Sequence, residues 1–154
     1  MRDVTSGCKI SIDKEGRWFY DKSQITHPAV LDTFYNALQI DNQGRYKIVV
    51  GDEFCYVDVE DTPFIVRSVS KRHDGKYVIF LNSGKSESLD PHSLRIGKDN
   101  VLYARLSNGI EVRFSRQAYY SLALDMEQKE NGDIVLYSGG KSYTIQPGRE
   151  QLTE

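Results

Sequence analysis

This chain of 154 residues has a small net charge, few histidines and no long apolar runs. The formal net charge is −2, with charged residues of both signs, so the chain lacks the basic excess that indicates nucleic-acid binding. Its three histidines, His27, His73 and His92, are isolated from cysteines and acids at metal-ligand spacing. No stretch approaches the ~18–20 apolar residues of a membrane span. We therefore expect no metal site and no cofactor, and neither nucleic acid nor a membrane as a partner.

Cysteine is also rare, since Cys8 and Cys55 are the only two. The opening segment, MRDVTSGCK, contains no apolar stretch of the kind that begins a signal peptide. Two single thiols in such a chain are more often reduced and structural than joined in a disulfide. We therefore predict reduced cysteines and a cytoplasmic location.

Aromatic residues, in contrast, are plentiful: ten Tyr and six Phe fall mostly in alternating runs, which is typical of β-sheet. Alternation predicts one hairpin from 10–12 and 17–20 and another from 45–50 and 54–59. A helix is expected between them, with Thr26 as N-cap and Pro28 in the first turn. Its apolar residues follow helical spacing as far as Leu38, before DNQG starts a turn.

The second half repeats this kind of order. Strands are expected at 63–69 and 76–81, then a polar connection over 82–93 and two strands within 94–106. A strand at 110–114 precedes a helix capped by Ser115, and a hairpin turns at Gly139-Gly140. The apolar face expected for this helix consists of Tyr119, Leu122, Ala123 and Met126.

Residues 94–106 also resemble residues 9–21, with Ile96 in the place of Ile12 and Lys98 in that of Lys14. This recurrence indicates an internal duplication. We predict an α+β fold of two similar strand-strand-helix-strand-strand halves with antiparallel sheets. The halves are 1–62 and 63–154, and we expect them to share an interface, because a single sheet with one helix buries too little apolar surface alone.

Familiar catalytic motifs are missing. Two Gly-Lys-Ser segments, 82–86 and 138–142, lack the earlier glycine of a phosphate-binding P-loop, since Ile79 and Val135 occupy that position. Both are expected to be β-turns, although the turn at Ser138–Gly140 could also form a small anion nest with Lys141. No serine stands in a nucleophile-elbow pattern. We therefore expect that the protein is not an enzyme.

Two groups of charged residues remain as candidate sites. Glu60 and Asp61 are adjacent in VEDTPF, where the chain is expected to pass from the first half to the second. They either bind backbone amides and an arginine, Arg67 or Arg105, or face a groove and hold a ligand. Use of either carboxylate as a catalytic acid or base is the weakest alternative, because neighbours in a strand point to opposite faces.

The second group lies on a predicted strand pair, where Glu111 and Arg113 share a face and Arg105 can meet them from the preceding strand. Cross-strand pairs of opposite charge are normally surface salt bridges of little energy. Alternatively, Arg105 or Arg113 grips a carboxylate or a phosphate, which suits the planar guanidinium.

Several motifs in order resemble a bacterial family known only as domain of unknown function 1285. They are an opening Gly-x-Trp-Phe with a later Ile, a central Val-Glu-Asp-x-Pro-Phe, an Arg with Gly-x-Glu-x-Arg, a Tyr-x-Leu and a final Ser-Gly-Gly. The matching residues are Gly16, Trp18, Phe19, Ile25, Val59, Glu60, Asp61, Pro63, Phe64, Arg105, Gly109, Glu111, Arg113, Tyr120, Leu122, Ser138, Gly139 and Gly140. Ile110, Val112 and Leu102 depart from the family pattern but stay apolar.

The resemblance implies a duplicated α+β unit whose second half is similar to a pleckstrin-homology-type barrel. It also implies a ligand site between the halves, for a small anionic or nucleotide-like molecule, and a role in signalling without catalysis. We expect Glu60, Asp61, Arg105, Glu111 and Arg113 to bind that ligand. The alternative function is a protein–protein interaction adaptor, which an exposed apolar patch near Tyr119 and Tyr120 would favour and full burial of both would oppose.

Overall fold

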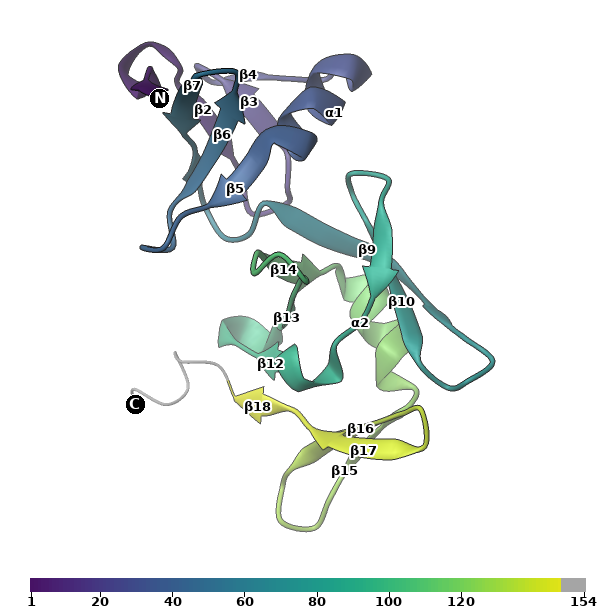
Figure 1. Ribbon diagram of the computed structural model, residues 1–154. Coiled ribbons are helices and arrows are strands. Elements are labelled where there is room, and N and C mark those ends of the chain that lie inside the picture. The colour runs from purple at the N-terminus through teal and green to yellow at the C-terminus, as the bar shows by residue number, and fades with distance from the viewer. Residues whose placement is uncertain (148–154) are drawn as a thin grey trace. The chain divides into compact units, whose positions relative to one another are not determined.

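The computed structural model describes residues 1–147. The chain divides into two compact units, unit 1 (Met1–Pro63) and unit 2 (Phe64–Glu154). Strands predominate in both, and each unit contains one α-helix in its described part (Figure 1). The α+β class predicted from the sequence is therefore confirmed. No helix in residues 1–147 is both long enough and apolar enough to cross a membrane.

Unit 1 consists of two four-stranded sheets and helix α1 (Pro28–Ala37). The first sheet has the order β1-β7-β6-β5, with strands β1 (Arg2–Asp3), β7 (Glu53–Tyr56), β6 (Tyr46–Val50) and β5 (Leu38–Ile40). The second has the order β4-β3-β2-β8, with strands β4 (Ser23–Gln24), β3 (Trp18–Tyr20), β2 (Ile10–Ile12) and β8 (Asp58–Val59). A 3-10 turn, η1 (Thr5–Gly7), precedes β2.

Unit 2 contains a seven-stranded sheet, a three-stranded sheet and helix α2 (Arg116–Ala123). The larger sheet has the order β11 (Ser86–Ser88), β10 (Tyr77–Leu81), β9 (Phe64–Lys71), β14 (Glu111–Phe114), β13 (Leu102–Arg105), β12 (Arg95–Ile96) and β18 (Gln146–Pro147). The smaller one has the order β15 (Met126–Gln128), β16 (Ile134–Ser138) and β17 (Lys141–Thr144). Two 3-10 turns, η2 (Pro91–Ser93) and η3 (Lys98–Asn100), flank β12.

The hairpin turns follow directly from local sequence. In the turn after β2, the Oδ1 atom of Asp13 accepts the amides of Glu15 and Arg17, and Gly16 takes a φ of 80°. Asp41 makes the same bonds in the turn after β5. Because an L-residue with a side chain rarely adopts such a φ, an Asp-x-x-Gly pattern between two apolar runs specifies this turn.

The helix limits agree with the sequence only in part. Ser115 caps α2 as predicted, since its Oγ accepts the amide of Ala118 at 3.1 Å. The prediction of Thr26 as the cap of α1 was wrong, because His27 holds that position and its Nδ1 accepts the amide of Ala29 at 3.2 Å. Leu38, which follows the helical spacing, belongs to β5, and Met126 likewise belongs to β15. Both are paired with a strand further along the chain, and this pairing ends the helices early.

The prediction of antiparallel sheets was wrong in part, because three of the four sheets in residues 1–147 also contain a parallel pair. β9 pairs with β14, β2 with β8, β1 with β7 and β12 with β18 in parallel. The expected polar connection at 82–93 contains β11 and η2. Parallel partners need a long connection between them, so the neighbouring residues carry no signal for these pairings.

The two cysteines form a disulfide in unit 1, which corrects the prediction of reduced thiols. Cys8 and Cys55 are 47 positions apart in sequence, and their Cα atoms are 6.3 Å apart. They meet because β1 pairs with β7, which carries Cys55, and η1 then delivers Cys8 to the same place. The cytoplasmic location stays a prediction, and the disulfide, which is typical of oxidising compartments, removes one of its supports.

Candidate functional site

The predicted residues Glu60 and Asp61 belong to unit 1, where the chain leaves β8. The backbone amide of Glu60 donates to the carbonyl of Ile12 at 2.9 Å, and so extends the pairing of β8 with β2. Glu60 is exposed and Asp61 is half-buried, whereas Thr62 and Pro63, which follow, are fully buried. This segment therefore combines a buried chain crossing with two carboxylates at the surface, as its sequence suggested.

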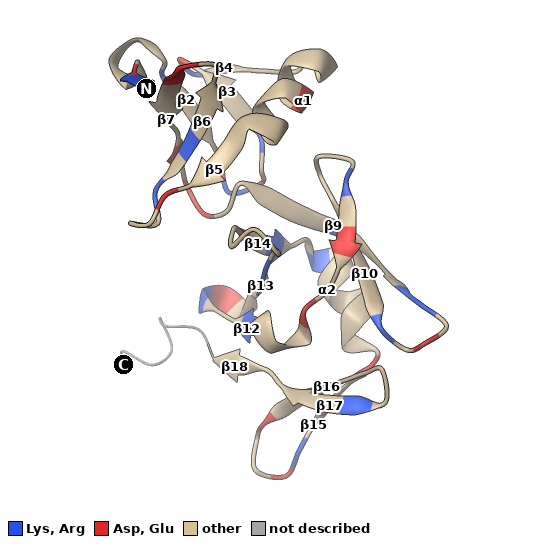
Figure 2. Cartoon of the chain, in the orientation of Figure 1, with Lys and Arg blue, Asp and Glu red and all other residues tan. Residues whose placement is uncertain are grey.

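The other three predicted residues, Arg105, Glu111 and Arg113, share one face of β13 and β14 in unit 2. Arg105 lies opposite Glu111 in the antiparallel ladder, and Arg113 lies opposite Tyr103. Their neighbours Val112 and Phe114 point to the other face and are buried. The structure thus brings these three charged residues to one face of the strand pair. Elsewhere on the chain, Lys and Arg are interspersed with Asp and Glu (Figure 2). The ligand-binding role of all five residues stays a prediction.

Glu111 is bound by an arginine that the sequence analysis did not single out. Both Nε and Nη2 of Arg95 donate to Oε2 of Glu111, at 3.1 and 2.6 Å. The two side chains are only 27% and 31% exposed, so this ion pair is better shielded from solvent than a surface salt bridge. Glu111 therefore has a structural partner on β12.

Arg95 also lies over the ring of Tyr103, and the backbone at Gly97 approaches the same ring closely. The guanidinium carbon of Arg95 lies 4.3 Å from the centre of the Tyr103 ring, which is the geometry of a cation–π contact. A Cβ atom at Gly97 would come within 2.9 Å of that ring, so this position requires glycine. Gly97, Arg95 and Tyr103 together fix the start of the loop that leads to η3.

Beyond this loop lies a polar pocket of about 180 Å³ in unit 2. It lies between the η3 loop, β14 and the first turns of α2. The lining consists of Asp99, Asn100, Val101, Leu102, Arg113, Phe114, Arg116, Tyr119 and Tyr120. Arg113 is the member that the sequence had predicted as a ligand-binding residue, and Arg116 adds a second guanidinium.

The loop side of the pocket has an uncommon backbone. Asp99 and Asn100 are consecutive, and their φ angles of 59° and 61° place both in the left-handed region. Asp and Asn tolerate that region better than other side chains, but each such residue still costs on the order of 1–3 kcal/mol. With this backbone conformation, the Asp99 carboxylate and the Asn100 amide both belong to the pocket lining.

On the other side of the pocket, the cationic Arg116 lies at the amino end of α2, where the helix disfavours a positive charge. Arg116 is the first residue of α2, and the amino end of a helix carries a partial positive charge. A bound anion there would be favoured by both the helix and the arginine. The hydroxyl of Tyr119, whose pKa is raised further by burial, is protonated at neutral pH and can donate to an anion.

Sequence reasoning missed Arg95, Arg116 and the Asp99-Asn100 pair. Arg116 carried a signal, since an arginine directly after a serine cap lies at the amino end of the helix, where a cation is disfavoured. The possible anion nest at Gly139 loses one donor, because the Gly139 amide donates to the Gly75 carbonyl at 3.1 Å. Within residues 1–147 no group of three or more His, Cys, Asp or Glu is placed to hold a metal ion.

Comparison with solved structures shows the fold in two bacterial proteins of the DUF1285 family. One, from Silicibacter pomeroyi DSS-3, is 23% identical and superposes with a TM-score of 0.76, over 96% of this chain and 84% of its own. The other, from Shewanella baltica OS155, is 18% identical with a TM-score of 0.67, over 76% of this chain and 91% of its own. No protein-family model and no curated protein matches the sequence. The resemblance indicated by the motifs is thus confirmed by the structural match over most of the chain.

Proposed function

We propose that this protein is a non-catalytic module that binds a small anionic ligand at the pocket of Arg113 and Arg116. The observation that carries the proposal is that two arginines, Arg113 and Arg116, line one polar pocket. Guanidinium groups bind carboxylates and phosphates in a bidentate way. The lining includes no Ser, Cys or His, and Asp99 is its one carboxylate.

The size and the polar groups of the pocket narrow the ligand further. A volume of about 180 Å³ is below the ~300–1,000 Å³ of most small-molecule sites, so it suits a phosphate-sized or small hydroxy-acid group. A nucleotide-like ligand would place its phosphate inside and its base on the exposed ring of Tyr120. Asp99 and Asn100 would accept or donate hydrogen bonds to a ligand hydroxyl. Binding of this kind fits the signalling role that the family resemblance implies.

We also propose that the two units arose by duplication, with unit 2 related to a pleckstrin-homology-type barrel. In each unit the helix leads straight into a three-stranded antiparallel meander, β5-β6-β7 after α1 and β15-β16-β17 after α2. The first turns of the two meanders have the same hydrogen bonds, with the amides of Gly44 and Gly132 each bonded three residues back. These shared features support a common origin.

The anion site is tested by replacing Arg116, which is exposed, so its replacement leaves no cavity in the core. We expect Arg116→Gln to weaken binding of inorganic phosphate or nucleoside monophosphates at least tenfold, as measured by calorimetry. Arg67→Gln is the matched control, because Arg67 is also an exposed arginine of unit 2 but does not line the pocket. A ligand at about 100 times its Kd should also stabilise the native protein by ~2.7 kcal/mol. Equal affinities in the two variants, or no binding by any anion, would overturn the proposal.

An adaptor role is the second candidate, and one observation favours it. Tyr120 is 63% exposed and Leu124, four residues later, is 85% exposed, so the end of α2 presents apolar surface to solvent. Tyr119 is half-buried, which leaves the predicted patch partly exposed. Leu124 lies outside the pocket lining. Leu124→Ser should therefore weaken the binding of a protein partner and leave anion binding unchanged. If the protein binds only an anion and has no protein partner, this change should have no effect.

A further inference from the structure

We propose that unit 1 contains a second binding site, for a compact apolar molecule that is neutral or carries an amine. The site is the cavity beside the Cys8–Cys55 disulfide, and it is separate from the anion pocket of unit 2. Its volume is about 400 Å³, which is within the ~300–1,000 Å³ range of small-molecule sites.

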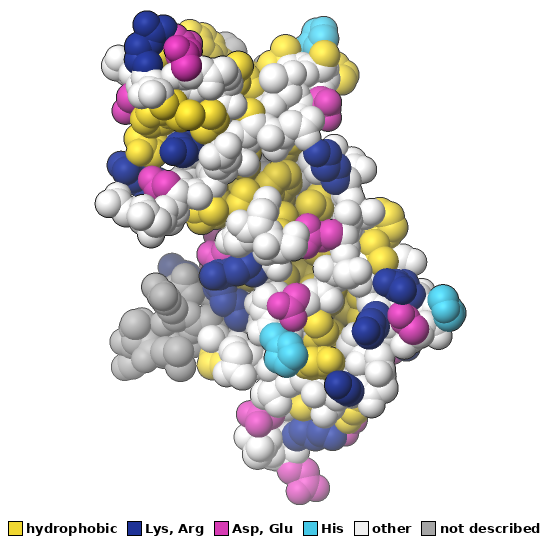
Figure 3. Space-filling view, viewed as in Figure 1, with side chains coloured by type: hydrophobic (Ala, Val, Ile, Leu, Met, Phe, Trp, Pro, Cys, Tyr) yellow, Lys and Arg dark blue, Asp and Glu magenta, His cyan; other side chains and the backbone are white. Residues whose placement is uncertain are grey.

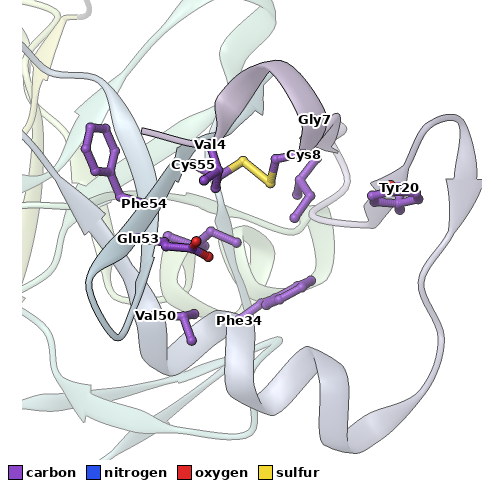
Figure 4. A pocket seen from close by; sticks show the side chains of 11 residues that line it. Val4, Gly7, Cys8, Tyr20, Phe34, Val50, Glu53, Phe54 and Cys55 are labelled. Atoms are coloured by element: carbon purple, nitrogen blue, oxygen red, sulfur yellow. A yellow bond between two sulfur atoms is a disulfide. The ribbon is translucent and has the colours of Figure 1, made fainter. Parts of the chain in front are cut away.

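The cavity is built from several elements of unit 1. Figure 4 shows the disulfide on one side and Phe34 of α1 with Val50 of β6 on the opposite side. Ile10 and Ile48 also line it and are only 6% and 5% exposed, so the deep part of the cavity is set in the core of the unit. This wall is made of apolar atoms and a disulfide, which carries no charge.

The mouth of the cavity is apolar as well. Tyr20 and Val50 line it and are 52% and 55% exposed, which is uncommon for side chains of this size. Apolar side chains are visible on the surface of unit 1 in Figure 3. Helix α1 contributes Phe34, yet none of its ten residues is fully buried. The unit therefore leaves apolar surface open around a cavity, which a ligand would cover.

The charge at the cavity selects the class of ligand. Apart from the Tyr20 phenol, Glu53 is the only ionisable side chain in the lining, and Arg2 forms an ion pair with it. A carboxylate at the rim repels an acid and attracts an amine, which could take the place of the exposed Arg2 guanidinium. We therefore commit to an apolar molecule without negative charge.

Gly7 provides a way to block the cavity without disturbing the fold. It lines the cavity, a Cβ atom there would have no neighbour within 4 Å, and its φ is not in the left-handed region. Gly7→Leu should place its side chain in the cavity. Ser6→Leu is the matched control, because Ser6 lies in the same 3-10 turn, is exposed, and does not line the cavity.

The experiment is a fluorescence titration of the full-length protein with the neutral apolar dye N-phenyl-1-naphthylamine. We expect Gly7→Leu to lower the affinity at least tenfold and Ser6→Leu to leave it within twofold. Emission of Trp18, the only tryptophan, checks that unit 1 stays folded in both variants. Equal binding by the two variants, or no binding by the wild type, would overturn the site.

The charge selection is tested by competition between two ligands with the same chain, octylamine and octanoate. We expect octylamine to displace the dye at a concentration at least tenfold lower, and Glu53→Gln to reduce this preference. Equal displacement by both, unchanged in Glu53→Gln, would overturn the ligand class. Dye release on self-association, detected by sedimentation at increasing protein concentration, would identify a second copy as the occupant instead. The anion site is unaffected by any of these results, because its variants lie in unit 2.

Discussion

Helix α1 of unit 1 and helix α2 of unit 2 occupy similar places in the chain but are packed very differently. α2 buries Ala118 and Leu122, whereas α1 buries none of its residues. Besides Pro63, seven buried hydrophobic side chains belong to unit 1, against 21 in residues 64–147 of unit 2. Only unit 1 contains a disulfide. The comparison teaches that similar local patterns can be stabilised by different means, a covalent link in one unit and a continuous core in the other.

Loss of the disulfide should have the largest effect. The bond closes a loop with a sequence separation of 47, and the entropy lost by the unfolded chain corresponds to about 4 kcal/mol. We expect the double variant Cys8→Ala/Cys55→Ala to lose that amount of unfolding free energy in unit 1. Urea denaturation followed by Trp18 emission measures it, because Trp18 is buried in this unit. A loss below about 1 kcal/mol would show that the small core of unit 1 suffices.

A pair of leucine truncations would test the difference between the helices. Leu122 is 0% exposed, and Leu122→Ala should cost about 3 kcal/mol through lost burial and the cavity that remains. Leu31 of α1 is half-buried, so Leu31→Ala should cost only about 1 kcal/mol. Chemical denaturation followed by circular dichroism gives both values. Equal costs would mean that α1 is as firmly packed as α2, contrary to the burial of its residues.

Ion pairs show the same contrast on a smaller scale. Glu111→Gln weakens the two hydrogen bonds from the half-buried Arg95, and we expect a loss of about 1.5 kcal/mol in unit 2. The control, Glu15→Gln in unit 1, breaks an exposed pair with Arg17 and should cost about 0–0.5 kcal/mol. Thermal unfolding at low and high salt measures both changes. A loss at Glu111 that vanishes in high salt would show that this pair is screened like a surface bridge.

The sequence predicted the elements whose signal is local and missed those that depend on distant partners. The turns at Asp13 and Asp41, the cap at Ser115 and the hairpin at Gly139-Gly140 follow from side chains a few positions apart. The early end of α1 at Ala37 does not, because the pairing of Leu38 with Ile48 decides it.

The candidate sites divide in the same way. The shared face of Arg105, Glu111 and Arg113 follows from strand alternation, which the sequence contains. The partner of Glu111 is Arg95, on another strand, and the disulfide joins Cys8 to a cysteine 47 positions away. The residues that neighbour these positions in sequence predict neither the ion pair nor the disulfide. The two cavities are also made by elements far apart in the chain, so only the folded structure reveals them.

The smallest expected effect concerns the turn of unit 1 at Asp41 and its response to acid. The Arg45 amide bonded to Asp41, helped by the Gln43 amide and the charge of Arg45, holds the pKa of this carboxyl below its ordinary value against a smaller opposing effect of burial. The folded state therefore binds the proton less readily than the unfolded chain. The stability contributed is fully present above the ordinary pKa of about 4 and is lost as pH falls through the folded value.

Asp41→Asn keeps an oxygen that can accept the amides of the turn but removes the charge. We expect a slight destabilisation of unit 1 at pH 7 that shrinks as the pH falls below the ordinary pKa of about 4, because the wild-type carboxyl then becomes protonated as well. Urea denaturation followed by Trp18 emission across this pH range measures the difference. If the gap between Asp41→Asn and the wild type instead widened in acid, the carboxylate would be destabilising the turn, and the account of the Asp-x-x-Gly hairpins in unit 1 would be wrong.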